Sequence, residues 1–174
     1  MTRPLQATRP PVVEQSGLLV CAPLRLEARA VRRGLDGTAA VVTTGYGPRR
    51  AAARAATLGP LSFGALAIAG TGGGLTDDLT PGDLVVASEV SDGHTVTPIP
   101  SAALLAGELR RAGLRVRTGR VVTVDHLFRP GQRDRLAADG AIAVDMESAE
   151  LIKAAQGRPV AVIRAISDTP GRPL

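Results

Sequence analysis

Residues 17–35 read GLLVCAPLRLEARAVRRGL, an apolar run at 17–22 followed at once by an amphipathic segment at 24–35. The first part is typical of a strand buried in a sheet, and the second has the spacing of a helix. The alternation continues along the chain, with further strands expected at 39–43, 65–69, 83–90, 120–124, 142–144 and 160–166 and further helices at 48–58, 101–112, 132–138 and 146–156. This order predicts an α/β fold with a mixed, mostly parallel central sheet and helices on both faces.

The chain has 174 residues, and we expect one domain at 17–174 preceded by a flexible, proline-containing arm at 1–16. No apolar run approaches the ~20 residues of a membrane-spanning helix, and the arm lacks the apolar stretch of a secretory signal. Cys21 is the only cysteine, which excludes a disulfide framework and a cysteine-rich zinc site. We therefore expect a cytoplasmic protein that is not inserted in a membrane.

The formal net charge of +5 at pH 7 makes nucleic-acid binding worth considering. However, the arginines are spread along the sequence and cluster only in pairs, and aromatic residues, which stack on single-stranded bases, make up only 2%. We expect no nucleic-acid partner, whereas a small anionic ligand would suit the charge equally well. His94 and His126 lack the spacing of metal ligands, so we expect neither a metal nor a cofactor.

Residues capable of chemistry follow several predicted strands, and in such sheets ligands bind at the carboxyl ends of the strands. The third strand runs into GTGGGL at 70–75, where glycines let backbone N–H groups approach a ligand closely. Glu27, Glu147 and Asp168 follow the first, sixth and last strands. Each feature also has an ordinary interpretation: a tight turn for the glycines, a helix cap for Glu147 or Asp168, and a solvated helix charge for Glu27.

Taken together, three carboxylates around one crevice suit the cleavage of a bond at a sugar carbon. One carboxyl can act as an acid, one can hold hydroxyl groups and one can activate water, because the environment of each sets its pKa.

Four motifs resemble the superfamily that contains the purine nucleoside phosphorylases and the methylthioadenosine/adenosylhomocysteine nucleosidases. They are GTGGGL at 70–75, LTPGDLVVASEV at 79–90, AVDMESAE at 143–150 and VIRAISD at 162–168, in the family's order. LRRAGLRVRTG and AVDMESAE are most similar to nucleosidase-like proteins of bacterial hopanoid gene clusters, which remove adenine from adenosylhopane. The resemblance implies a three-layer αβα sandwich that hydrolyses the N-glycosidic bond of an adenine nucleoside or a 5′-substituted adenosine.

The resemblance also implies roles for single residues. Asp168 would be the acid that protonates N7 of the base, and partial burial beside a second carboxylate would favour its protonated form. Glu27 would polarise the attacking water. The other residues implied would contact the substrate: Glu147 at the ribose 2′- and 3′-hydroxyls, Met146 beneath the sugar, Thr71, Gly72 and Gly73 around the nucleophile, and Leu127 or Phe128 against the base.

Phosphate could replace water as the nucleophile, as it does in the phosphorylases of this superfamily. Phosphorolysis needs cationic groups, preferably arginines, around a phosphate dianion. Arg25 stands where the resemblance places one candidate phosphate ligand, but Ile68 occupies the position of a second. We therefore favour hydrolysis, with a phosphate-dependent purine nucleoside phosphorylase as the alternative.

The sequence departs from the family after Ser167-Asp168, where the family continues with a further helix and this sequence ends at Leu174. That helix would cover one face of the sheet and hold Asp168 at its N-terminus. A truncated, non-catalytic nucleoside-binding protein of the same fold is therefore a competing interpretation. The partners expected are a small-molecule nucleoside and further copies of the chain, in a homodimer or a higher homo-oligomer.

Overall fold

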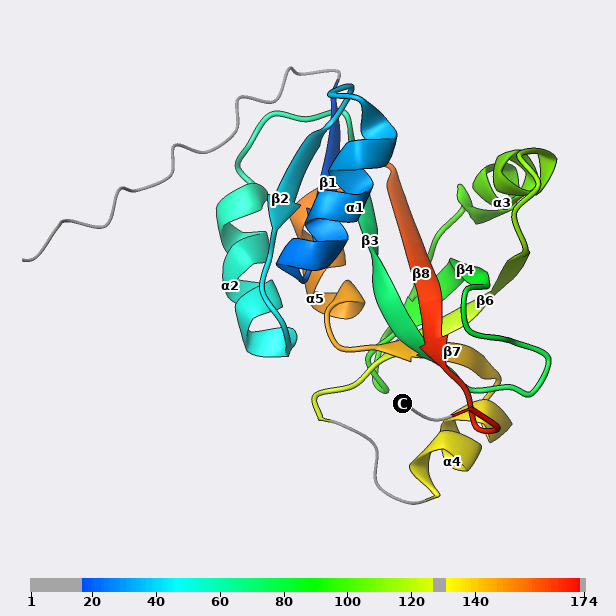
Figure 1. The fold of residues 1–174 in the computed structure, drawn as a ribbon. Helices are drawn as coiled ribbons and strands as arrows, with labels where there is room; N and C mark the ends of the chain where they lie inside the picture. The colour runs from blue at the N-terminus through cyan, green and yellow to red at the C-terminus, as the bar shows by residue number, and fades with distance from the viewer. Residues whose placement is uncertain (1–16, 127–130, 173–174) are drawn as a thin grey trace, which may run out of the picture.

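Eight strands of the computed structural model form one sheet in the order β2-β1-β3-β7-β6-β4-β5, with β8 paired to both β3 and β4 (Figure 1). Residues 17–126 and 131–172 are described, so the expected arm at 1–16 lies outside the described residues. Between the described strands, antiparallel pairing is confined to β3–β7, β4–β5 and β4–β8. The strands are β1 (Leu18–Ala22), β2 (Ala40–Thr43), β3 (Ala65–Gly74), β4 (Leu84–Ser91), β5 (Val96–Pro98), β6 (Val116–Thr123), β7 (Ala141–Asp145) and β8 (Val160–Asp168).

Helices cover both faces of this mostly parallel sheet, which confirms the α/β fold and its three layers. One face carries α1 (Arg25–Leu35) and α3 (Ala102–Arg111). The other carries α2 (Pro48–Leu58) and α5 (Ser148–Ile152), with a 3₁₀ turn at Lys153–Ala155. A further helix, α4 (Gln132–Ala138), packs against β7 at the lower end of the molecule in Figure 1.

The main core is aliphatic apart from Phe63, in keeping with the shortage of aromatic residues. Leu19 and Cys21 of β1 are fully buried, as are Leu66 and Ile68 of the neighbouring β3. Because successive strand residues point to opposite faces, these side chains share one face of the sheet. Burial raises the pKa of the Cys21 thiol to about 12, so the single cysteine is an inert part of the core.

The other face of the sheet carries an apolar groove of about 1000 Å³ between α1 and α3. Leu18 and Val20 of β1 and Ile163 of β8 contribute to its lining. One face of β1 thus packs in the core and the other lines the apolar groove. This explains why the run at 17–22 is apolar throughout instead of alternating with polar residues.

Several segments differ from the prediction, among them β6, which begins at Val116 rather than at 120. β3 continues through Gly74, beyond its expected end at 69, so the alternative interpretation of the glycines as a tight turn is wrong, and they pair as a strand with β8 and β7. The short β5 was not predicted, because three residues carry too little pattern. β8 ends at Asp168 and is followed by a bridge between Thr169 and Arg172, so Asp168 is not a helix cap.

Close packing rather than a turn explains the glycine at position 72. A Cβ atom there would lie 2.8 Å from the carbonyl oxygen of Val144, and backbone cannot yield as a flexible side chain can. Gly72 therefore allows β3 to run tightly beside β7.

We expect Gly72→Ala to lower the free energy of unfolding by about 1–3 kcal/mol, because the added methyl group overpacks this contact. The matched control is Gly107→Ala in the middle of α3, where the nearest atoms to a new Cβ are 3.9 Å away on Arg111. Alanine should stabilise that helix by up to about 1 kcal/mol. Urea unfolding of both variants measures the difference, and equal effects would contradict the packing argument.

Candidate active site

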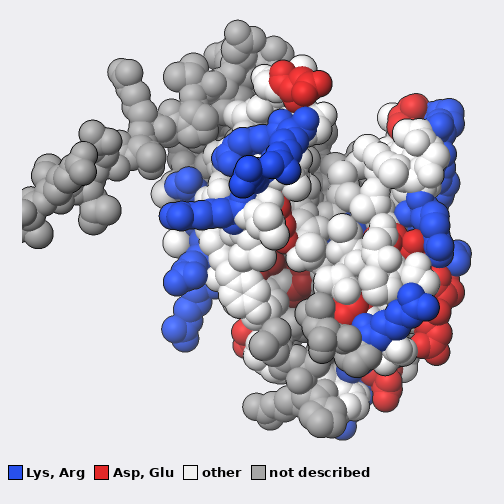
Figure 2. All heavy atoms as spheres, viewed as in Figure 1, with Lys and Arg blue, Asp and Glu red and all other residues white. Residues whose placement is uncertain are grey.

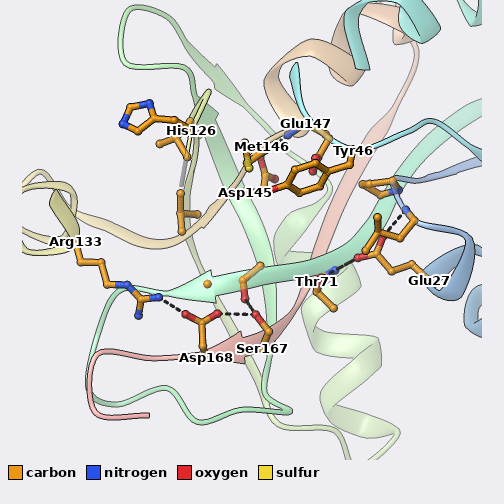
Figure 3. Close-up of a pocket in the computed structure, with 16 residues that line it drawn as sticks. Glu27, Tyr46, Thr71, His126, Arg133, Asp145, Met146, Glu147, Ser167 and Asp168 are labelled. Carbon is orange, nitrogen blue, oxygen red and sulfur yellow. Dashed lines mark hydrogen bonds and ion pairs between the residues drawn. The ribbon is translucent and has the colours of Figure 1, made fainter. Parts of the chain in front are cut away.

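A pocket of about 360 Å³ opens where several parallel strands end (Figure 3). Its walls come from the residues after β1, the carboxyl-terminal part of β3 and the carboxyl ends of β6, β7 and β8. The structure thus brings together side chains that are far apart in the sequence. Seven of the expected site residues line the pocket: Glu27, Thr71, Gly72, Gly73, Met146, Glu147 and Asp168. The expected stacking residues Leu127 and Phe128 lie outside the described residues.

Glu27 lies in the first turn of α1, where a negative charge is favoured by the helix dipole. One carboxylate oxygen, Oε2, accepts a hydrogen bond of 2.7 Å from the backbone N–H of Leu24. The other, Oε1, accepts hydrogen bonds from the backbone N–H and the hydroxyl of Thr71, at 2.7 and 2.8 Å (Figure 3). Glu27 therefore fastens α1 to β3 at the pocket wall, and its interpretation as a solvated helix charge is wrong.

Glu147 is almost fully buried, with 4% of its surface exposed. The backbone N–H of Gly47 donates a hydrogen bond of 2.8 Å to its Oε1 atom. Burial raises the pKa of the Glu147 carboxyl, and the hydrogen bond from Gly47 and the charge of Arg164 only partly oppose this effect. Glu147 stands at the start of α5 but makes no side-chain cap hydrogen bond, so it is available to the pocket.

Asp168 is the last residue of β8 and is also buried. Its Oδ1 atom accepts a hydrogen bond of 2.6 Å from the Ser167 hydroxyl. Its Oδ2 atom forms an ion pair with Arg133, which reaches into the pocket from α4 (Figure 3). The second carboxylate expected beside Asp168 is thus a wrong prediction, because a guanidinium group occupies that place.

Arg164, which was not among the expected site residues, binds two residues at or next to the pocket, Asp145 and Ser148. Its side chain is completely buried on β8, and its Nε atom donates a hydrogen bond of 2.8 Å to Oδ2 of Asp145. Its Nη2 atom donates at 2.8 Å to the hydroxyl of Ser148. Asp145 in turn accepts hydrogen bonds from the backbone N–H groups of Glu147 and Ser148, so it caps α5.

A signal for Arg164 was present in the sequence. It lies in the otherwise apolar strand VAVIRAIS and shares its face with Val162 and Ile166, which are buried. A charge in the middle of a buried strand face must have a partner, and this requirement marks it as part of a site.

Three further lining residues were also missed. Tyr46 follows β2 and, in Figure 3, places its ring beside Met146 and Glu147. Arg133 lines the pocket beside Asp168, and His126 lines it from the connection after β6, apart from Asp168 in Figure 3. These residues lie in connections or in a short helix, where periodicity carries no signal for their orientation.

The candidate phosphate ligand Arg25 is not among the residues that line the pocket. It is the first residue of α1 and is exposed, and Figure 2 shows the arginines of this helix gathered on the outer surface. Within residues 17–126 and 131–172, no group of three histidine, cysteine or acidic residues could hold a metal ion. None of the helices in these described ranges is long and apolar enough to cross a membrane.

Comparison with known proteins identifies the family. The family model described as the phosphorylase superfamily matches residues 25–173, so the chain belongs to this superfamily. No curated protein matches the sequence significantly.

Solved structures with the same fold include nucleosidases and a futalosine hydrolase. Helicobacter pylori MTAN gives a TM-score of 0.77 at 17% identity, covering 88% of this chain and 89% of its own. Futalosine hydrolase of the same organism gives a TM-score of 0.78 at 17% identity, and the match covers 88% of this chain and 84% of the hydrolase. The S-adenosylhomocysteine nucleosidase of Streptococcus pyogenes, in complex with 5-methylthiotubericidin, gives 0.77 at 19% identity, covering 90% and 86%.

The buried ion pair predicts a strong energetic coupling between Arg164 and Asp145. Arg164→Met should lower the free energy of unfolding by about 3–5 kcal/mol, because it leaves the Asp145 charge buried without its cation. Adding Asp145→Asn removes that charge, so the double variant should be less destabilised than the sum of the two single variants. Chemical unfolding of all four proteins measures the coupling, and additive effects would contradict it.

The raised pKa of Glu147 predicts a pH-dependent effect on stability. The folded state favours the protonated carboxyl, so ionisation of Glu147 costs stability as the pH rises from its unfolded pKa through its folded pKa. Glu147→Gln removes this cost and retains an oxygen that can accept the hydrogen bond from Gly47. The melting temperature of the variant relative to wild type should therefore increase between pH 4 and pH 8. A difference in melting temperature between the variant and the wild type that stays constant from pH 4 to pH 8 would contradict the raised pKa of Glu147.

Proposed function

We propose that this protein is a purine nucleosidase, which hydrolyses the C1′–N9 bond of a purine nucleoside. The observation that carries the proposal is the presence of three carboxylates, Glu27, Glu147 and Asp168, around one pocket of nucleoside size. Structures with the same fold are named as nucleosidases and a futalosine hydrolase, which supports this reaction class. A cytoplasmic location and a homo-oligomeric state remain predictions from the sequence.

The ribose is proposed to bind at Glu147 and Met146. One oxygen of the Glu147 carboxyl is held by the N–H of Gly47, and the group lines the pocket from the start of α5. A buried carboxylate is a strong acceptor for the 2′- and 3′-hydroxyls, and binding replaces the solvation that burial has removed. The thioether of Met146 offers an adaptable apolar surface to the sugar ring.

Water is the proposed nucleophile, placed near Glu27 and Thr71. Arg25 does not line the pocket, and Ile68 is buried in the core, so neither position provides a cation for phosphate. The buried Arg164 is offset by Asp145. Glu27, by contrast, would repel a phosphate dianion and can accept a proton from water.

The proposed reaction balances as follows. The C1′–N9 bond breaks and its electron pair passes to the base, while the Asp168 carboxyl donates a proton to N7. The water oxygen bonds to C1′, and the proton released from water passes to Glu27. The products are the free purine and ribose. General acid catalysis at N7 supplies about 10²–10⁴ in rate, equivalent to roughly 3–5 kcal/mol of barrier.

We expect Asp168→Asn to cut the chemical step with a purine nucleoside by about 10²–10⁴, because asparagine cannot transfer the proton. Substrate binding should change by less than roughly tenfold, since the side chain keeps its size and an acceptor oxygen. The control substrate is p-nitrophenyl riboside, whose leaving group needs no protonation and which should be much less affected. Single-turnover kinetics measure both steps, and undiminished purine release by the variant would exclude Asp168 as the acid.

A further inference from the structure

We infer that Arg133 makes the base end of the pocket selective for a 6-oxopurine over a 6-aminopurine, an inference that rests on the proposed function. Arg133 reaches from the first turn of α4 to the carboxylate of Asp168. Its side chain is 22% exposed and that of Asp168 is 9% exposed, so the pair is largely withdrawn from water. Arg133 also donates a long hydrogen bond of 3.4 Å to the carbonyl oxygen of Gly74.

The two classes of purine differ in the group beside N7. Both offer N7 as an acceptor, but a 6-oxopurine adds the O6 acceptor whereas a 6-aminopurine adds the N6 amino donor. A guanidinium group is a donor only, and its planar fork suits the adjacent N7 and O6 atoms. His126, which also lines the pocket, is exposed and is engaged by Asp125.

The resting contacts of Asp168 turn this difference into selectivity. Ser167 occupies Oδ1 and Arg133 occupies Oδ2, so a base that needs Asp168 at N7 must displace one of them. A 6-oxopurine gives Arg133 a new acceptor in O6, and the released carboxyl can then carry the proton for N7. A 6-aminopurine presents a second donor instead, so the guanidinium has no new partner and remains on Asp168.

Charge in the leaving group adds to the same preference. As the C1′–N9 bond breaks, its electron pair enters the ring, and in a 6-oxopurine part of the negative charge reaches O6. A guanidinium beside O6 stabilises this charge where it develops. The 6-amino group offers no such oxygen. The structure therefore favours a 6-oxopurine nucleoside over the adenine nucleoside expected from the sequence.

The test compares inosine with adenosine for the wild type, Arg133→Met and Arg133→Lys. Because one charge-assisted hydrogen bond separates the substrates, kcat/KM of the wild type should favour inosine by about 10–100-fold. Arg133→Met should lose most of this ratio through a fall in the value for inosine, and Arg133→Lys should retain part of it. The matched control is Arg135→Met on the exposed side of the same helix, which should leave the ratio unchanged.

A second measurement separates this inference from the proposed function. Calorimetry with free hypoxanthine and free adenine should show tighter binding of hypoxanthine, and Arg133→Met should remove the difference. If neither nucleoside is cleaved but this binding preference is present, the proposed function is wrong and the role of Arg133 stands. Equal use and equal binding of the two bases, or equal losses with both in Arg133→Met, would overturn the inference while leaving the nucleosidase intact.

Discussion

The buried ion pair between Arg164 and Asp145 is the interaction on which the site depends. It joins β8 to the end of β7 with a hydrogen bond of 2.8 Å, and both side chains are withdrawn from water. Asp145 also accepts from the N–H groups at the start of α5 and so sets the position of Glu147. Burying two charges is costly, and here the cost is offset by partners for several of their polar atoms. The main consequence of the pair is that it fixes the positions of β7, β8 and the start of α5, and with them the position of Glu147 in the pocket wall.

The side chains of Arg164 and Glu27 both lie close to the backbone of β3 at Gly70. A Cβ atom at Gly70 would lie 2.7 Å from Nη1 of Arg164 and 3.0 Å from Oε1 of Glu27, so any larger residue would displace the end of at least one of these side chains. The same segment carries Thr71, whose N–H and hydroxyl hold Glu27. The glycine thus leaves space for the end of a buried cation and for a pocket carboxylate on the same side of the β3 backbone. The mostly parallel sheet gathers the remaining groups, because several of its strands end at this pocket.

Much of the fold and part of the site could be predicted from the sequence. Apolar runs such as 17–22 and amphipathic runs such as 24–35 are local signals, so most elements were placed correctly. Carboxylates directly after strands were informative because strand direction fixes where they emerge. Arg133 could not be predicted, since its pairing with Asp168 joins residues 35 apart and depends on how α4 packs. The extended course of the glycines was also hidden, because glycine-rich sequence usually indicates a turn.

Product analysis with inosine tests the central claim, that this pocket uses water to cleave a nucleoside, most directly. The protein is incubated in phosphate-free buffer and in phosphate buffer, and free base, ribose and ribose 1-phosphate are quantified. If water is the nucleophile, hypoxanthine and ribose should form in equal amounts in both buffers, at a rate that phosphate does not increase. Base release that requires phosphate and yields ribose 1-phosphate would contradict it, as would no base release from any purine nucleoside.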